Sequence, residues 1–154
     1  MDPRANSTEK LRAPAPLPHI SRRALKRVKH PEPMPSCCRY CSGTVKLVDN
    51  SEIYGRSYGE WPYMIWCETC DAYVGLHPHT DIPLGTLADK PLREARKTNK
   101  ALFLRLQREQ GWSRTEAYSW LADEMKIPAM DCHWGLFEEA QCEKAGRICE
   151  RQLR

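Results

Sequence analysis

Two C-x-x-C pairs constrain the fold of this chain more than any other feature of its sequence. Cys38 and Cys41 form the first pair, and Cys67 and Cys70 form the second. Together they supply four thiolates, the ligand set of a closed tetrahedral zinc site with a structural role. A closed site leaves no open position for water, so such a zinc stabilises a fold and does not activate a nucleophile. The sequence therefore predicts one structural Zn²⁺ bound by these four cysteines.

The residues around the pairs agree with a zinc ribbon that has an enlarged loop. Gly43 follows the first pair closely, and glycine permits the chain to turn back beneath the metal. The 25 residues between the pairs exceed the roughly 15–20 residues of the usual spacing. Cys37 remains an alternative to Cys38 as the first ligand. A redox-active pair would need a thioredoxin-like βαβ pattern, and neither pair has one around it.

The chain between residues 37 and 90 predicts short strands joined by turns. Segments 45–48, 63–66 and 73–76 are rich in aromatic and β-branched residues, and the last two flank the second cysteine pair. Gly55, Gly59 and Pro62 interrupt the connection from the first strand to the second. We expect a small antiparallel sheet organised by the zinc.

Residues 91–154 predict three helices. The first has an apolar face and ends near Gly111, and the second opens with a capping box from Ser113 to Glu116. The third is expected from about residue 136 to 152. The inward-facing residues predicted for the first helix are Leu92, Ala95, Leu102, Phe103 and Leu106; for the second, Ala117, Tyr118, Leu121 and Met125; for the third, Phe137, Ala140, Ile148 and Cys149.

Residues 1–36 differ from the rest in composition. They hold seven of the twelve prolines and eight Lys/Arg against three Asp/Glu. Proline removes backbone donors and restrains the preceding residue, so we expect a disordered basic tail, within which residues 21–30 could form one or two helical turns. The predicted fold is α+β: tail 1–36, zinc-ribbon-like subdomain 37–90, and three-helix subdomain 91–154 packed with it as one domain.

The cysteines and hydropathy bear on the setting of the protein. No apolar run approaches the ~20 residues of a membrane span, and the amino end lacks the apolar core of a secretory signal. Paired cysteines without such a signal favour metal ligands in a reducing, cytoplasmic setting over disulfides. The remaining thiols, Cys132, Cys142 and Cys149, are expected to serve packing, and a second metal site with Cys132 and His133 stays an alternative.

Basic residues provide the main functional hypothesis, which is binding of DNA or RNA without catalysis. The first predicted helix carries basic side chains away from its apolar face, where they could contact phosphates. The loop Tyr54–Trp61 interleaves arginine with aromatic residues, which can stack on unpaired bases or simply cover the sheet. The candidate nucleic-acid-binding residues are Arg93, Arg96, Lys97, Lys100, Arg56, Tyr58, Arg22, Arg23, Lys26 and Arg27.

Two other functions stay open at this point. A rigid zinc domain could serve as an interaction adaptor for a protein partner. His77 and His79 lie close in sequence to Asp71 and Asp81, a combination that could form a second metal site or an acid–base pair of a nuclease or hydrolase. A histidine that stabilises the turn after the sheet is the simpler interpretation, because no recognised hydrolase motif surrounds these residues.

Several longer segments resemble a known family. They are Trp66–His77, Pro83–Ala88, Leu92–Lys97, Ser113–Ala122 and Cys132–Phe137. In these segments the chain resembles the zinc-finger-containing-domain family of bacterial and phage proteins over roughly residues 36–150. The resemblance implies a cysteine-bound zinc, a compact helical second half, and the cytoplasm of a bacterial cell or phage-infected host. It implies no particular activity.

Overall fold

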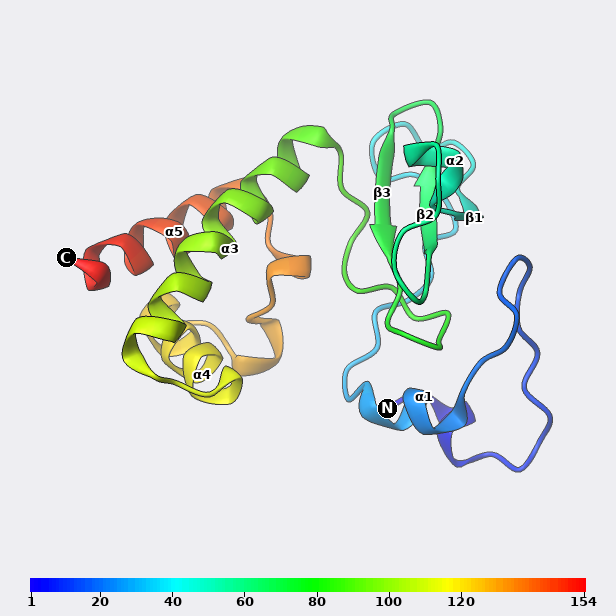
Figure 1. Cartoon of the computed structure of the whole chain (residues 1–154), viewed down its shortest axis with the longest axis horizontal. Coiled ribbons are helices and arrows are strands. Elements are labelled where there is room, and N and C mark those ends of the chain that lie inside the picture. The colour runs from blue at the N-terminus through cyan, green and yellow to red at the C-terminus, as the bar shows by residue number, and fades with distance from the viewer. The chain divides into compact units, whose positions relative to one another are not determined.

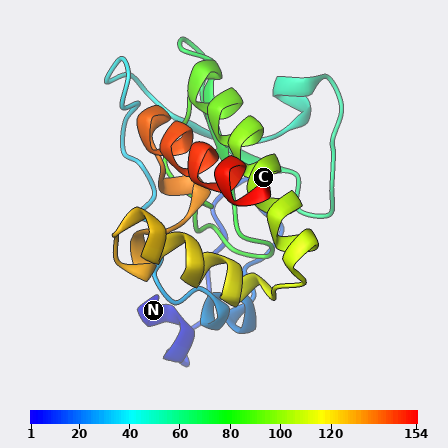
Figure 2. The ribbon, with the colours of Figure 1, turned by 90° about the vertical axis from the view of Figure 1, so that its left-hand side faces the viewer.

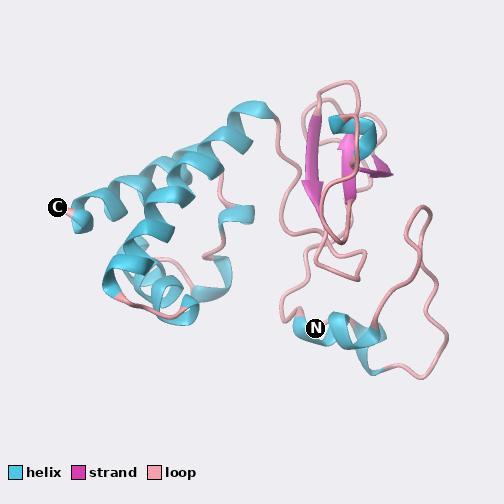
Figure 3. Ribbon diagram, in the orientation of Figure 1, coloured by secondary structure: helices cyan, strands magenta, loops and turns pink.

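The computed structural model describes all residues from Met1 to Arg154. The chain forms two compact units, Met1–Asp89 and Lys90–Arg154 (Figure 1). All strands belong to the first unit, and the second is helical (Figure 3). The division falls one residue before the predicted boundary between the zinc subdomain and the helices. Packing of the two units as a single domain stays a prediction.

A three-stranded antiparallel sheet forms the centre of the first unit. Its strands are β1 Lys46–Asp49, β2 Tyr63–Cys67 and β3 Ala72–Gly75, in the order β1-β2-β3. Leu47, Ile65 and Val74 are directly opposite one another across the three strands. Side chains two residues apart share a face of a strand, so Cys67 lies on the same face as Ile65. This face packs in an apolar cluster. The antiparallel sheet and the helices together confirm the predicted α+β class.

The enlarged loop between β1 and β2 is held by side chains at the end of β1. The short helix α2 Ser51–Tyr54 begins the loop and ends at Gly55, whose φ is 88°. Buried Asn50 donates to the carbonyl of Tyr58 at 3.0 Å and accepts from its amide at 2.9 Å. Asp49 accepts hydrogen bonds from the Ser51 amide and the Ser57 hydroxyl, which lower the pKa of its carboxyl.

The disordered tail predicted for residues 1–36 is not confirmed. This segment forms a 3-10 helix, η1 Pro3–Asn6, and a short helix, α1 Arg22–Arg27, which begins at Ser21. Leu25 is fully buried in an apolar cluster with Ala5, Ile20, Val28 and Ile82, the last of which lies beyond β3. Leu17 enters the cluster that contains the sheet. The prolines prevent long regular elements, but they do not prevent apolar residues between them from packing.

A bidentate ion pair joins the amino end to the loop after β3. Arg4 Nη2 lies 2.7 Å from Asp81 Oδ1, and Nη1 lies 3.0 Å from Oδ2. Asp2 binds the same guanidinium, which lowers the pKa of the Asp2 carboxyl. The Ser21 amide donates to the carbonyl of His79 at 2.8 Å. The amino-terminal segment is therefore part of the folded zinc unit.

Three longer helices build the second unit: α3 Lys90–Gln110, α4 Arg114–Met125 and α5 Glu139–Leu153. Two 3-10 turns, η2 Ala129–Asp131 and η3 Trp134–Leu136, connect α4 to α5. Gly111 ends α3 with a φ of 68°, and the predicted capping box of Ser113 and Glu116 is present. The helix α5 packs against α3 (Figure 2). In the first unit, α1 lies within residues 21–30, where one or two helical turns were considered, and α2 was not predicted.

The inward faces of α3 and α4 agree with the prediction, but that of α5 differs. Every residue predicted to face inward on α3 and α4 is buried or half-buried. The helix α5 begins at Glu139, because Glu138 and Gln141 form a capping box there. Phe137 is buried but precedes the helix, and Ala140 is exposed, contrary to prediction. The buried residues of α5 are Cys142, Ala145, Gly146, Ile148 and Cys149, so the prediction is confirmed for Ile148 and Cys149.

None of the helices is both long enough and apolar enough to cross a lipid bilayer. The longest helix, α3, carries charged residues along much of its length.

Candidate metal centre

The two C-x-x-C turns bring four sulfur atoms together. The Sγ atoms of Cys38, Cys41, Cys67 and Cys70 all lie within 4.8 Å of one another. The Cys41 and Cys67 Sγ atoms are 3.7 Å apart. Tetrahedral zinc with Zn–S bonds of about 2.3 Å requires sulfur–sulfur distances of about 3.8 Å. The spacing is far longer than the S–S bond of about 2.05 Å in a disulfide. The geometry therefore fits four thiolates around one zinc ion.

Local backbone geometry positions the first pair. The Cys38 amide donates to the carbonyl of Gly43, and the Ser42 amide donates to the carbonyl of Cys38, each at 2.8 Å. The amides of Tyr40 and Gly43 point at the Sγ atoms of Cys38 and Cys41, both at 3.4 Å. The Tyr40 donor lowers the pKa of Cys38 and so favours its thiolate, which is the protonation state that zinc requires.

The residue after each pair has a left-handed backbone. Ser42 follows Cys41 with a φ of 62°, and Asp71 follows Cys70 with a φ of 50°. The Asp71 carboxylate also accepts a hydrogen bond from Trp66 Nε1 at 3.1 Å. The same reversal of the chain thus follows both turns, and the second turn connects β2 to β3 directly.

Gly43 has a different role from the predicted one. Its φ is not in the left-handed region, where Ser42 lies instead. A Cβ atom at Gly43 would lie 3.1 Å from the Cys41 Sγ atom. The glycine is therefore required for the close approach of the backbone to sulfur, and not for the turn itself.

Electrostatics within the cluster favour a cation. Burial raises the pKa of Cys38, but the backbone amides of Tyr40 and Cys41 and the neighbouring thiols outweigh it and lower the pKa to about 7. The Cys41 thiol, burial and the other sulfurs raise the pKa of Cys70 to about 12. The backbone hydrogen bond from Cys70 lowers the pKa of Cys67, but burial and the Cys38 and Cys41 thiols outweigh it and raise the pKa. Without a metal, the negative charge of the Cys38 thiolate disfavours ionisation of Cys67 and Cys70. A dication among the sulfurs offsets the repulsion between the thiolates.

The four cysteines form a structural zinc site. Cys38 and Cys67 are buried in the apolar cluster of the sheet, while Cys41 is exposed. Cys37, the alternative ligand, is exposed and lies outside the sulfur cluster. The Arg39 guanidinium, inside the first turn, donates to the carbonyl of Leu87 at 3.3 Å. The zinc thus connects the segment before β1 to the turn after β2, and Arg39 connects the first cysteine turn to the chain beyond β3.

The remaining cysteines belong to the core of the helical unit. Cys132, Cys142 and Cys149 are fully buried there. Burial raises the pKa of Cys132 and Cys142 to about 11 and that of Cys149 to about 12, so these thiols stay protonated. His133 stacks near Tyr118, with ring centroids 5.7 Å apart.

The residues considered for a catalytic site have structural contacts. Asp81 binds Arg4, and Asp71 accepts from Trp66. His79 stacks on His19 with ring centroids 5.2 Å apart, and their ring nitrogens share a hydrogen bond of 3.1 Å. The backbone carbonyl of His77 accepts from Thr80, so that residue takes part in the turn after β3. Across the whole chain, the four cysteines are the one group of three or more metal ligands that the structure gathers.

The candidate nucleic-acid-binding residues fall into two classes. Some have structural contacts: Arg96 donates to the carbonyl of Phe137, and Arg22 donates to the carbonyls of Arg4 and Glu9. Arg93 is half-buried and also has a partner. The others are exposed, and these are Arg23, Lys26, Arg27, Arg56, Tyr58, Lys97 and Lys100.

Sequence reasoning missed a second set of exposed basic residues, on α5 and just after it. Lys144, Arg147 and Arg151 of α5 and Arg154, which follows the helix, recur at intervals of three and four residues. That periodicity is a sequence signal for one helix face. The net charge of the segment does not reveal this face, because residues 138–154 hold as many acidic residues as basic ones.

Comparisons with known proteins agree with the metal centre. The model of a family described as a zinc-finger-containing domain matches residues 34–152, which include both cysteine turns and all three long helices except the last residue of α5. The same comparisons find no match among curated proteins or among solved structures.

Proposed function

Because the chain belongs to the family of zinc-finger-containing domains, we propose that its zinc unit is a platform for binding nucleic acid. In this proposal the zinc is structural, and exposed basic and aromatic side chains make the contacts. Basic side chains that neutralise phosphates release counterions, which provides sequence-independent affinity.

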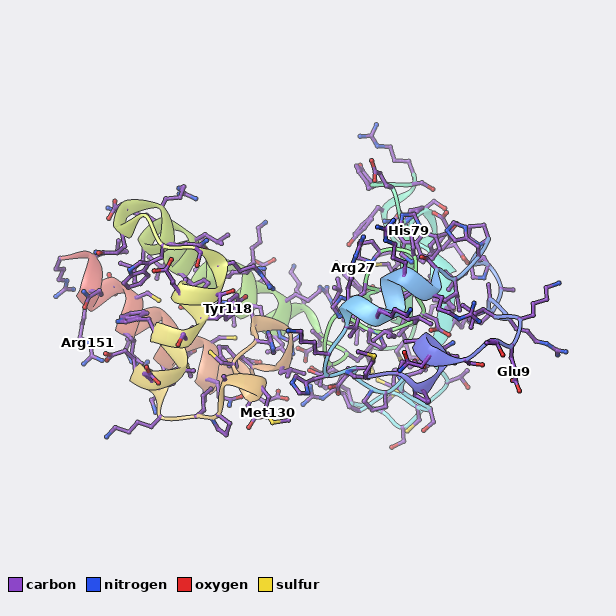
Figure 4. All side chains as sticks on the ribbon, turned by 90° about the horizontal axis from the view of Figure 1, so that it is seen from below. Glu9, Arg27, His79, Tyr118, Met130 and Arg151 are labelled. Atoms are coloured by element: carbon purple, nitrogen blue, oxygen red, sulfur yellow. The ribbon has the colours of Figure 1, made fainter.

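The main support for the proposal is that α1 packs on the zinc unit with its basic side chains exposed. Leu25 and Val28 anchor the helix in the apolar cluster with Ile82. Arg23, Lys26 and Arg27 are exposed, lie within about 100° of one another around the helix axis, and make no ion pair. The basic charge expected in a flexible tail is therefore held on a folded surface. Figure 4 labels Arg27 on this helix.

The loop after α2 offers contacts of a second kind. The Arg56 guanidinium lies 4.5 Å from the centre of the Tyr58 ring. Tyr58 meets Tyr54 edge to face at 5.6 Å, and the two tyrosines are 47% and 45% exposed. Exposed aromatic rings beside an arginine can stack on bases while the cation pairs with a phosphate. The loop is anchored by Asn50, so these rings do not need to be ordered on binding.

Binding of labelled nucleic acid to the zinc-loaded full-length protein tests the proposal. A duplex and a single strand of mixed sequence would be titrated between about 50 and about 200 mM salt. We expect the double variant Arg23→Gln/Arg27→Gln to bind more weakly and to reduce the slope of log K against log salt by up to about 2, since each phosphate contact contributes about 0.9 on duplex DNA.

Lys10→Gln/Arg12→Gln is the matched control, because it removes two exposed positive charges from the same segment outside α1. If the control lowers the slope as much as the α1 variant, the contacts are not localised on α1. Absence of binding by the wild-type protein at low salt would refute nucleic-acid binding altogether.

A further inference from the structure

A groove in the helical unit has an unusual concentration of unpaired positive charge. It has a volume of about 610 Å³ and lies between the carboxyl end of α4 and the middle and carboxyl end of α5. Two acidic residues, Glu124 and Glu150, line the groove. The five basic residues that line it are Lys126, Lys144, Arg147, Arg151 and Arg154. All five are exposed, and none makes an ion pair or a side-chain hydrogen bond within the chain.

We infer that this groove is a second phosphate-binding surface, which contacts the backbone of the nucleic acid bound by the protein. The inference rests on the proposed function. None of the groove residues belongs to the candidate nucleic-acid-binding residues on α1, α3 and the loop after α2.

The arrangement of charges on α5 suits a polyanion. Lys144, Arg147, Arg151 and Arg154 follow one another at helical spacing and cover one face of the helix. From the first to the last, the row is about 15 Å long at 1.5 Å per residue. It therefore matches about four nucleotide steps of a duplex strand at about 3.4 Å each. Figure 4 shows Arg151 extending outward from α5.

The helix dipole accounts for only part of this charge. Basic residues in the last turn of a helix stabilise it by interacting with the free carbonyls. Arg151 and Arg154 fit that explanation, whereas Lys144 and Arg147 lie in the middle of α5. Lys126, at the carboxyl end of α4, lies on the other side of the groove. Charges on both walls fit a ligand with repeated negative groups.

The chemistry of the lining favours phosphate over carboxylate partners. Three of the five basic residues are arginines, whose planar guanidinium groups bind phosphate oxygens in pairs. Ile148 is the one apolar residue of the lining, and it is 6% exposed. The groove thus offers little apolar surface for the side chains of an acidic peptide, and its binding capacity is electrostatic.

The test compares two charge-matched variants of the zinc-loaded full-length protein. Lys144→Gln/Arg151→Gln removes two charges from the groove. Lys90→Gln/Arg108→Gln removes two exposed charges from α3 outside it. With labelled duplex at about 0.1 M salt, we expect the groove variant to bind roughly ten- to sixtyfold more weakly, the factor for losing one or two counterion-releasing contacts. The control should stay close to wild type, and both should keep the helical circular dichroism of the parent.

Three results would overturn the inference, and they are distinguishable. If wild type binds the duplex and the groove variant matches the control, the groove is not a contact surface while the proposed function stands. If wild type itself does not bind, the proposed function fails and the inference fails with it. If the charges of the groove matter for binding polyglutamate and not for the duplex, its partner is an acidic protein segment.

Discussion

At the scale of single residues, two neighbouring cysteines have different environments. Cys38 is buried with its sulfur among the other three ligands, and Cys37 is exposed and outside the cluster. Sequence spacing alone permits either one to pair with Cys41. The difference arises because the Cys38 amide and carbonyl are both engaged in the turn that ends at Gly43. The backbone therefore directs one side chain of the pair toward the metal.

The two cysteines provide a matched test of the metal centre. We expect Cys38→Ser to weaken zinc binding by more than about 100-fold, since losing a ligand should exceed the 10–100-fold cost of losing a supporting contact. Cys37→Ser should keep one zinc per chain. Metal content by mass spectrometry and a competition titration with a chelator would measure both. Equal zinc content and affinity in the two variants would contradict the assigned ligand set.

At the scale of elements, the helical unit depends on close approach of α5 to α3. A Cβ atom added at Gly146 of α5 would lie 1.9 Å from Oδ1 and 2.7 Å from Cγ of Asn99 on α3. Asn99 is held in place by its own hydrogen bond to the carbonyl of Ala95 at 2.8 Å. The absence of a side chain at Gly146 is thus what permits the two helices to pack at this distance.

We expect Gly146→Ala to lower the free energy of unfolding by about 1–3 kcal/mol, the usual cost of overpacking a core. The loss would occur although alanine is the better helix former by up to about 1 kcal/mol. In the Asn99→Ala background the cost should fall by more than half, because only the Cβ atom at 3.1 Å remains close. Urea unfolding of the four proteins of this double-mutant cycle measures the coupling. An unchanged cost in that background would show that another contact is responsible.

The helix boundaries show which sequence patterns are sufficient to predict where a helix begins and ends. The apolar periodicity and the capping box placed α3 and α4 correctly, since both signals are local. The start of α5 was predicted about three residues too early, because the apolar residues Leu136 and Phe137 continue the helical spacing. In the structure they belong to the turn η3 and its end, and the capping box at Glu138 begins the helix.

At the scale of the whole molecule, the two units have separate interiors. The apolar cluster of the helical unit contains only residues from Lys90 onward, and the clusters around the sheet and α1 contain only residues before it. Both cysteine turns belong to the first unit. The zinc therefore stabilises one of the two interiors directly.

Removal of zinc should affect the units unequally. Structural zinc contributes about 10–16 kcal/mol to folding in zinc-finger peptides, which is comparable to the total stability of about 5–15 kcal/mol of a typical domain. We expect a chelator to abolish amide protection in β1, β2 and β3 while α3, α4 and α5 stay protected. Hydrogen exchange by mass spectrometry resolves the two regions. Loss of protection in both units, or in neither, would contradict this division of stability.

The sequence by itself determined the zinc ligand set apart from the choice between two neighbouring cysteines, the α+β class, and the positions of the strands and of α3 and α4. Each of these follows from spacings within a few residues or from periodicities of two and 3.6. Only the tertiary structure decided that Leu17 and Leu25 bring the amino-terminal segment into the fold, and that Arg96 and Arg22 bind backbone carbonyls. These outcomes depend on contacts between residues distant in the chain. Composition is averaged over a segment, and it cannot show which of its residues make such contacts.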